Sequence, residues 1–489
     1  MNTPVASAVI ERLKEALGPR GWLDEPAAIA PHVTEWRERW VGETPLVARP
    51  ASTEQVARVV KICADSGTAI VPQSGNTGLV GGAVPPAGGG AIVLSLTRMT
   101  RLRALDAANF SLVAEAGCRL ADLQAAAAEH DRLFALSMAS QGSACIGGAV
   151  STNAGGTGVI KYGPMRQLVL GLEVVLPDGQ IWDGLKTLRK DNTGYDLKQL
   201  FIGAEGTLGV ITAVACALAP APRATETALL GVPDVAAATR LLATARQSLG
   251  DLVTAFELIP RLGLDFVVRH LPGARDPLAM RCPWYVLVEF ASARADAGLR
   301  ACLESLLEGA LAAGDVRGGV IAASEAQRAA LWALRHGLSE AQKFEGGSIK
   351  HDIAVPPARM ADFITRASRT VEQAIPGARI VAFGHLGDGN VHFNISQPQG
   401  AERPQAAERK AFLARWEEIN RLVHDIVADM GGSFSAEHGV GQLKLADMAR
   451  YKSPLELTLM RKIKQTLDPH NIMNPGRVIP PAPPPGGAS

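Results

Sequence analysis

Residues Gly142–Gly158 read GSACIGGAVSTNAGGTG, and two further glycine-rich segments, Gln73–Gly82 and Gly203–Gly209, lie on either side of it in the chain. Glycine lets backbone N–H groups approach a phosphate closely, and successive amides form an anion-binding nest. Glycine also serves turns and tight packing, so one such loop alone decides little. Three together predict a large phosphate-bearing cofactor that the backbone holds extensively.

None of the three loops fits the dinucleotide pattern G-x-G-x-x-G or the phosphate-loop pattern G-x-x-x-x-G-K-[ST]. A nicotinamide or ATP site is therefore disfavoured. The loops adjoin short apolar segments that we expect to be strands, at 68–72, 91–95, 111–115 and 210–217. Helices are expected at 5–17, 52–64 and 120–130, and a hairpin at 168–183 turns at Pro177-Asp178-Gly179.

After about residue 220 the pattern changes to a second set of strands and helices. Strands are expected at 229–232, 255–258, 284–290 and 348–353, and helices at 235–249, 297–313, 409–430 and 455–467. The sequence thus predicts an α+β protein with four parts: an N-terminal helical segment 1–45, a cofactor domain 46–220, an α+β second domain 221–450, and a C-terminal segment 451–489 with a Pro-rich tail.

Composition limits the class of protein. A chain of 489 residues is too long for one hydrophobic core, and a net charge of +1 gives no reason to expect nucleic acid as a partner. The six cysteines are scattered without metal-site spacing, which is typical of buried free thiols in a reducing compartment. We find no secretory signal and no uncharged apolar run of ~20 residues. We therefore expect a cytoplasmic protein without an integral membrane segment, while peripheral contact with a membrane stays open.

A histidine-containing hairpin is expected at residues 380–395. If Asp388-Gly389 forms a two-residue turn, paired residue numbers sum to 777, and His385 lies directly opposite His392. Asn394 then points to the same face. Directly opposed side chains are close enough for two imidazoles to share a metal. The alternative is a solvated pair, or core histidines with local hydrogen bonds.

The segment Ser435–Gly441 reads SAEHGVG and supplies Glu437 and His438. Two neutral imidazoles and one carboxylate form a common catalytic metal set with open positions for water or substrate. His438, next to the ligand Glu437, could accept a proton. The pattern therefore favours a metal site over an ordinary hairpin.

Two cations are candidates for binding an anionic substrate. Arg335 lies in an expected helix with Ser339 four residues later on the same face, and Lys350 lies in an alternating, strand-like segment. Any single Arg or Lys is more often a solvated surface charge. A planar guanidinium, however, suits a carboxylate that accepts two hydrogen bonds.

A family resemblance connects these motifs. Leu188–Leu197 (LRKDNTGYDL) leads into Phe201–Gly209 (FIGAEGTLG), and with the two earlier loops this order resembles the vanillyl-alcohol-oxidase-type (VAO/PCMH-type) flavoproteins, most of all the D-2-hydroxyglutarate and D-lactate dehydrogenase branch. The resemblance extends from about Thr34 to Val478 and includes Asn474-Pro475-Gly476-Arg477. It implies an FAD-binding domain of two α+β subdomains, an α+β cap (substrate) domain, and a C-terminal helical segment that returns to the FAD domain.

The resemblance also implies roles for the loop residues. The first loop would hold the FAD pyrophosphate, the second would line the flavin and ribityl chain, and the third would contact the adenine side. The corresponding positions are Pro72, Gly75, Asn76, Thr77 and Gly78; Gly142, Ser143, Gly147, Gly148, Thr152, Asn153, Gly155 and Gly156; and Gly206, Ile211 and, close to the flavin, Asn474. Some relatives attach FAD through a histidine in the first loop. This loop has Ser74 and Asn76 and no histidine, so we expect non-covalent FAD.

For the second domain, the resemblance implies a reaction centre. The matching positions make His385, His392 and Glu437 the metal ligands and His438 the general base, while Arg335, Ser339, Lys350 and Asn394 bind substrate. Zn²⁺ is the first choice from ligand type, and the same donors suit Mn²⁺ or Fe²⁺. Two departures affect the choice of substrate: Ser339 stands where the dicarboxylate branch usually has Thr, and His351 replaces an aromatic residue often found there.

The implied reaction is oxidation of D-2-hydroxyglutarate to 2-oxoglutarate, with the metal on the 2-hydroxyl, proton removal by His438, and hydride transfer to flavin N5. D-lactate or glycolate as substrate, a non-redox transferase and a non-catalytic FAD-binding subunit are the alternatives. The resemblance also implies an electron acceptor such as an electron-transfer flavoprotein or a quinone, and a homodimer.

Overall fold

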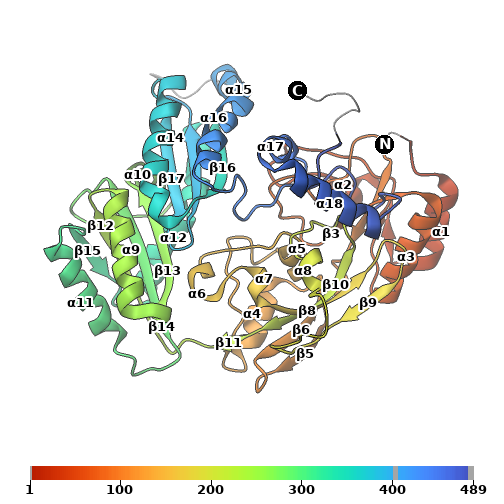
Figure 1. Ribbon diagram of the computed structural model, residues 1–489, viewed down its shortest axis with the longest axis horizontal. Helices are drawn as coiled ribbons and strands as arrows, with labels where there is room; N and C mark the ends of the chain where they lie inside the picture. The colour runs from red at the N-terminus through yellow and green to blue at the C-terminus, as the bar shows by residue number, and fades with distance from the viewer. Residues whose placement is uncertain (1–2, 400–405, 483–489) are drawn as a thin grey trace. The chain divides into compact units, whose positions relative to one another are not determined.

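The computed structural model describes residues 3–399 and 406–482 of the chain (Figure 1). The chain forms two compact units. Unit 1 contains Met1–Gly155, Gly163–Ala221 and Glu437–Ser489, and unit 2 contains Gly156–Tyr162 and Pro222–Ala436. Residues 483–489 of the expected Pro-rich tail lie outside the described residues.

Unit 1 contains two main sheets. The first has the order β1 (Trp22–Leu23), β2 (Val47–Ala48), β4 (Ala91–Ser95), β3 (Ala69–Gln73), with β3 and β4 parallel. Helices α1 (Ser7–Leu17) and α3 (Thr53–Ser66) pack apolar side chains against it, and α2 (Pro26–Val33) follows β1 in the chain. α3 begins where the side chain of Ser52, its N-terminal cap, accepts a hydrogen bond from the backbone amide of Gln55.

The second sheet of unit 1 is antiparallel. Its order is β5 (Leu102–Asp106), β6 (Ser111–Glu115), β10 (Val210–Ala217), β8 (Val169–Val175), β9 (Ile181–Gly184). The central strand β10 is buried along its whole length, as its uninterrupted run of small and apolar residues requires. The shorter elements are β7 (Arg132–Leu133), β11 (Ala219–Pro220), α4 (Leu120–Ala128), α5 (Ile146–Ser151), α7 (Met165–Leu168) and α8 (Lys198–Phe201).

The C-terminal segment belongs to unit 1. It contributes α17 (Leu445–Tyr451) and α18 (Pro454–Leu467), and the chain then runs beside β3. Met473 forms a parallel bridge with Ile70, and the amide of Asn474 donates to the Ile70 carbonyl over 2.8 Å. Asn474 is thereby placed close to the start of the first glycine-rich loop.

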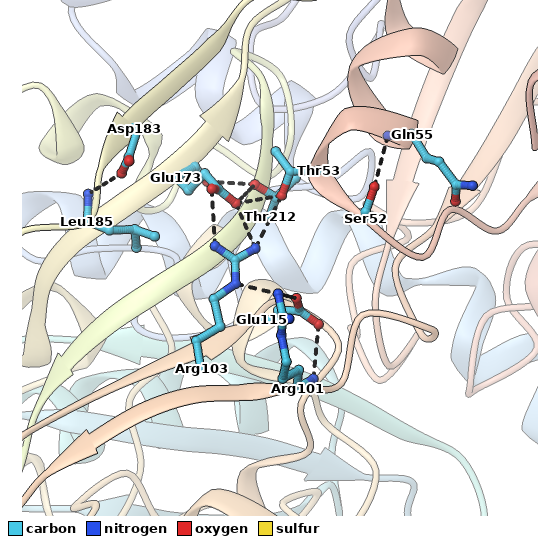
Figure 2. A network of polar contacts seen from close by, with 10 residues as sticks. All are labelled: Ser52, Thr53, Gln55, Arg101, Arg103, Glu115, Glu173, Asp183, Leu185 and Thr212. Atoms are coloured by element: carbon cyan, nitrogen blue, oxygen red, sulfur yellow. Dashed lines mark hydrogen bonds and ion pairs between the residues drawn. The ribbon is translucent and has the colours of Figure 1, made fainter.

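A charged network joins the second sheet of unit 1 to α3 (Figure 2). Arg103 of β5 donates to both carboxylate oxygens of Glu173 on β8, over 3.1 and 3.0 Å. Thr53 at the start of α3 and Thr212 on β10 donate to the same carboxylate over 2.6 and 2.8 Å. Burial opposes ionisation of Glu173, but these hydrogen bonds and the charge of Arg103 hold its pKa below the ordinary value.

We expect Arg103→Met to destabilise unit 1 by about 2 kcal/mol, less than the ~3–5 kcal/mol for breaking a fully buried pair, because solvent reaches Arg103. Since the pKa of Glu173 is depressed in the folded state, this stabilisation is complete above the ordinary pKa of 4.5 and disappears as pH falls through the folded pKa. Urea unfolding at pH 7 and at acid pH would measure both effects. Arg119→Met, which removes an exposed pair with Asp122, is the control and should leave the midpoint unchanged; equal midpoints for the two variants would contradict the prediction.

Unit 2 is built on a seven-stranded antiparallel sheet. Its order is β15 (Gly318–Ile321), β12 (Ala224–Val232), β14 (Trp284–Ser292), β13 (Val253–Pro260), β17 (Arg379–His385), β18 (Asn390–Ser396), β16 (Ser348–Ala354). One core cluster includes side chains of α9 (Val235–Leu249), α11 (Leu299–Ala312), α14 (Met360–Ala374) and α16 (Trp416–Asp429). A second cluster, on the other face, includes those of α10 (Arg261–His270), α12 (Glu325–His336) and α13 (Leu338–Ala341).

A short excursion of the chain completes unit 2. Residues 156–162 leave unit 1 and form α6 (Val159–Tyr162), which packs against β13. Lys161 donates to the Ala291 carbonyl over 3.2 Å, and Ile160 lies against Gly387 in the loop between β17 and β18. The last three residues of the second glycine-rich loop and the four residues of α6 are therefore part of the unit that carries the histidine hairpin.

One expected helix is wrong. Residues 409–430 form two helices, α15 (Ala406–Ala414) and α16, because the backbone of Arg415 leaves the helical region and its guanidinium donates to the Ala374 carbonyl at the end of α14. The described cysteines are free thiols, most of them buried, as the scattered pattern indicates. Over residues 3–399 and 406–482, no helix has the length and apolar character needed to span a bilayer.

Candidate active site

The three glycine-rich loops meet in unit 1. A side chain on Gly75 of the first loop would collide with the Ser143 carbonyl of the second, and one on Gly206 of the third would press on Pro72. The Gly203 amide donates to the Val150 carbonyl over 3.0 Å. These close approaches explain why the three segments are rich in glycine and bring together the residues expected to hold a cofactor.

Several residues that are predicted to bind the cofactor also stabilise the conformation of the glycine-rich loops. Asn76 and Asn153 both adopt a left-handed conformation with φ of 49°. The side-chain amide of Asn76 donates to the Pro31 carbonyl over 2.9 Å. The side-chain oxygen of Asn153 accepts from the backbone amide of Arg166, also over 2.9 Å. Of the other positions, Gly147 packs on Ala116, Thr152 donates to the Gly148 carbonyl, Ile211 is buried on β10, and Gly156 belongs to the unit 2 excursion.

Glu205 is a residue whose role sequence reasoning did not identify. Its buried carboxylate accepts the amide hydrogens of Val440 and Gly441 over 2.7 and 2.8 Å. A side chain on Gly439 would collide with one of its oxygens. The pKa of Glu205 is raised above its ordinary value, because the effect of burial outweighs that of the two amides, which lower the pKa. The third loop thus holds the turn that follows the Glu437-His438 dipeptide.

The histidine hairpin has a different register from the expected one. Phe383, not His385, lies opposite His392, so paired residue numbers sum to 775. The turn is wider than two residues because the amides of Asp388 and Gly389 both donate to the His385 carbonyl. The two histidines are therefore diagonal neighbours, and their ring centroids lie 5.7 Å apart.

The register gathers polar residues on one face of the unit 2 sheet. Asp352 of β16 lies opposite His392 of β18, and Lys350 lies opposite Asn394. Side chains two residues apart on a strand share a face, so all four point the same way. The Asn394 Oδ1 atom is buried and, among the described residues, has no hydrogen-bond partner. An acceptor in this position suits a ligand that donates a hydrogen bond.

His351 lies on β16 between Lys350 and Asp352, so its side chain points to the opposite face of the sheet. Its Nδ1 atom lies 2.8 Å from the Phe393 carbonyl oxygen, and its ring meets that of His424 edge-on at 5.5 Å between centroids. It is almost fully buried in the helix-covered core. The substitution of His351 for an aromatic residue therefore concerns core packing and not the face that carries Lys350.

Arg335 is the most buried of the cations predicted to bind substrate. It lies in the last turn of α12 and is 6% exposed, and its Nε atom donates to Glu257 over 2.6 Å. Gly337 separates α12 from α13, and Ser339 on α13 is exposed. The expected single helix is thus two successive helices, with Arg335 buried and Ser339 at the surface.

Glu257 is a second residue that sequence reasoning missed. It lies on β13 directly opposite His385, and its Oε1 atom is 2.6 Å from His385 Nδ1. Although complete burial alone would raise it, the charges of Arg335 and His385 hold the pKa of Glu257 at about 2. An ionised carboxylate in the middle of the sheet therefore bonds to two predicted site residues.

A group of potential metal ligands includes two residues of the unit 2 sheet. The amide of Ala436, the last residue of unit 2, donates to the Asp352 carbonyl over 3.2 Å, and Glu437 and His438 follow directly. Asp352, His392, Glu437 and His438 form one group of residues that could hold a metal ion. Sequence reasoning did not include Asp352, and His385 is outside this group. Imidazole and carboxylate donors suit Zn²⁺, Mn²⁺ or Fe²⁺.

Comparison with known proteins identifies the family. Residues 44–184 match the profile of an FAD binding domain, and residues 221–478 match the C-terminal domain of FAD linked oxidases. The mitochondrial D-2-hydroxyglutarate dehydrogenase of Arabidopsis thaliana is 36% identical over 471 residues, covering 96% of this chain and 81% of the relative. A D-2-hydroxyglutarate dehydrogenase of Xanthomonas citri is 36% identical over 455 residues, 93% of each chain.

The chain belongs to the D-2-hydroxyglutarate and D-lactate dehydrogenase branch of the FAD-linked oxidoreductases. It is an FAD-dependent D-2-hydroxy acid dehydrogenase. Solved structures confirm the expected VAO/PCMH-type fold. p-Cresol methylhydroxylase has a TM-score of 0.74 at 18% identity, covering 97% of this chain and 96% of its own. An alkyldihydroxyacetonephosphate synthase has a TM-score of 0.72 at 19% identity, covering 97% and 86%.

The residues of this dehydrogenase fit FAD. A Cβ atom built on Gly78 or Gly142 would meet nothing within 4 Å, so both loops border open space. Asn474 donates to the carbonyls of Gly82 and Glu205 over 2.9 and 2.7 Å. Its Oδ1 atom is buried and has no hydrogen-bond partner among the described residues, so it can accept from a bound ligand.

Proposed function

We propose that this dehydrogenase oxidises D-2-hydroxyglutarate to 2-oxoglutarate, with a divalent metal, Zn²⁺ as first choice, at the hydroxy-acid end of the substrate. The observation that carries the proposal is the polar face of the unit 2 sheet, where Arg335 and Lys350 provide two cations for the second carboxylate of a dicarboxylate substrate. Relatives named D-2-hydroxyglutarate dehydrogenase over nearly the whole chain support the same substrate.

The residues of the chain have distinct roles in this proposal. His438 accepts the proton of the 2-hydroxyl, and His385, His392 and Glu437 hold the metal, with Asp352 as a further carboxylate beside His392. Arg335, Ser339 and Lys350 hold the distal carboxylate of the substrate and orient the reacting carbon, and Asn394 is a further substrate contact. A bound metal would make the hydroxyl more acidic, and bound FAD would accept the hydride.

Bleaching of the flavin by a panel of D-2-hydroxy acids tests the choice of substrate. We expect kcat/KM for D-2-hydroxyglutarate to exceed the values for D-lactate and glycolate. A preference for D-lactate or glycolate would establish the monocarboxylate alternative. If no hydroxy acid bleaches the bound flavin, a non-catalytic FAD-binding subunit would be favoured.

Lys350→Gln should raise the KM for D-2-hydroxyglutarate by about 10-fold or more, since a hydrogen bond to a charged group contributes roughly 1.5–3 kcal/mol. The KM for D-lactate, which has one carboxylate, should change less. Steady-state kinetics of the variant with both acids would measure the difference. Lys343→Gln, which replaces an exposed lysine seven residues earlier, is the control. An equal change for both acids would contradict a role in binding the second carboxylate.

We further propose that FAD is bound non-covalently, because Gln73–Gly82 contains no histidine to attach it. Acid precipitation should release all the flavin into the supernatant, and flavin in the pellet would contradict this. An electron-transfer flavoprotein or a quinone as acceptor, a homodimer, and a cytoplasmic location, with or without peripheral contact with a membrane, stay predictions.

A further inference from the structure

Glu257 bonds at the same time to two groups that the proposed function assigns to different tasks. One carboxylate oxygen lies 2.6 Å from His385 Nδ1, and the other accepts from Arg335 Nε over 2.6 Å. The side chain of Glu257 is 1% exposed, and that of Arg335 is 8% exposed. The three residues come from β13, β17 and α12, so the carboxylate ties two strands and a helix together at this point.

The bond to Glu257 fixes how His385 is protonated. An ionised carboxylate is an acceptor only, so Nδ1 of His385 must carry a proton, and in the neutral imidazole Nε2 then keeps the lone pair. This is the tautomer in which a histidine binds a metal through Nε2 while a carboxylate orients the ring. Glu257 thus sets both the tautomer and the ring orientation that the metal-ligand role of His385 requires.

The bond to Glu257 also fixes the plane of the Arg335 guanidinium. With Nε engaged, and with the guanidinium carbon 4.9 Å from the centre of the Phe383 ring, the planar group has little freedom to rotate. The edge formed by Nη1 and Nη2 can still donate two parallel hydrogen bonds to a carboxylate. Phe383 is the cross-strand partner of His392, so this arrangement belongs to the polar face already described.

We infer that Glu257 is a positioning residue that links metal binding to substrate binding: a single carboxylate orients the predicted metal ligand His385 and the predicted substrate cation Arg335. This inference rests on the proposed function. It predicts that one substitution at residue 257 impairs two properties that substitutions of Arg335 and His385 impair separately.

A purely structural ion pair is the competing explanation, and the same sheet offers a matched control. Glu289 lies on the adjacent strand β14, and its side chain is 14% exposed. It accepts hydrogen bonds from Thr227, Arg328 and Trp332, none of which is a predicted site residue. Glu289→Gln therefore disturbs a half-buried carboxylate of this sheet without touching the candidate site.

The experiment compares Glu257→Gln with Glu289→Gln in the full-length FAD-loaded protein. For each variant, Zn²⁺ affinity is measured by titrating chelator-treated protein, and KM for D-2-hydroxyglutarate by flavin bleaching. We expect Glu257→Gln to weaken Zn²⁺ binding by about 10–100-fold, the usual effect of removing a carboxylate behind a metal-bound histidine, and to raise KM by about 10-fold or more. Glu289→Gln should change neither, Arg335→Met mainly KM, and His385→Asn mainly Zn²⁺ affinity.

The outcomes separate the inference from the proposed function. Wild type that binds Zn²⁺ and bleaches normally, together with a Glu257→Gln variant equal to Glu289→Gln, would overturn the inference alone. Wild type that does neither would overturn the proposed function. If Glu257→Gln does not fold, Glu257→Asp keeps the charge but, being one methylene shorter, cannot reach both partners. Losses in both properties with Glu257→Asp would support the inference, and unchanged Zn²⁺ affinity and KM would overturn it.

Discussion

His438→Gln should lower kcat for D-2-hydroxyglutarate by about 10²–10⁴-fold, the usual contribution of a positioned general base. Glutamine keeps a similar size and hydrogen-bonding capacity but cannot take up a proton at neutral pH. Glu205 holds the two amides that follow Gly439, so the turn should keep its conformation in the variant. Stopped-flow measurement of flavin reduction would isolate the step.

The matched control is His130→Gln, which replaces an exposed histidine of unit 1 whose Nδ1 atom contacts the Ala126 carbonyl. It should reduce its flavin at the wild-type rate. FAD content and melting temperature should be the same in both variants and the wild type. A His438→Gln protein that reduces its flavin within 10-fold of the wild-type rate would assign the proton to another acceptor.

Glu437→Gln should remove most of the bound metal and lower kcat by at least about 100-fold, since a neutral amide is a far poorer ligand than a carboxylate. Treating the wild type with a chelator should produce the same loss. Added Zn²⁺ should restore the chelated wild type and leave Glu437→Gln inactive. Metal and FAD contents are measured separately, so that loss of metal is distinguished from loss of flavin.

The control for this pair of measurements is Glu418→Gln, which removes an exposed carboxylate on α16. Its metal content and kcat should match those of the wild type. Full turnover by chelated wild type would contradict the metal role directly. Full turnover by Glu437→Gln with metal still bound would show instead that Asp352 and the histidines suffice.

Much of the fold could be predicted because its signals are local. The strands 91–95, 111–115 and 210–217 and the helix 235–249 have the bounds that their apolar patterns predict. The glycine-rich loops could be grouped because close backbone approach requires glycine at positions such as Gly75 and Gly206. At both positions another part of unit 1 lies where a Cβ atom would be, so only glycine fits.

The parts that could not be predicted depend on distant contacts. The hairpin register depends on a turn in which two amides share the His385 carbonyl, and the dipeptide Asp388-Gly389 alone does not reveal it. Glu257 is a single acid in an apolar strand, and Glu205 stands among glycines. Nothing adjacent to either residue in the sequence shows that its partners are Arg335 or the Val440 amide.

The excursion of residues 156–162 has a consequence for protein engineering. A chimera that joins the first 221 residues of this dehydrogenase to the second half of a relative would pair α6 from one parent with β13 from the other. Ile160 would then meet a foreign hairpin loop where Gly387 now makes room for it. Swaps between relatives should therefore transplant these seven residues together with the C-terminal half, even though residues 163–221 separate the two segments in the chain.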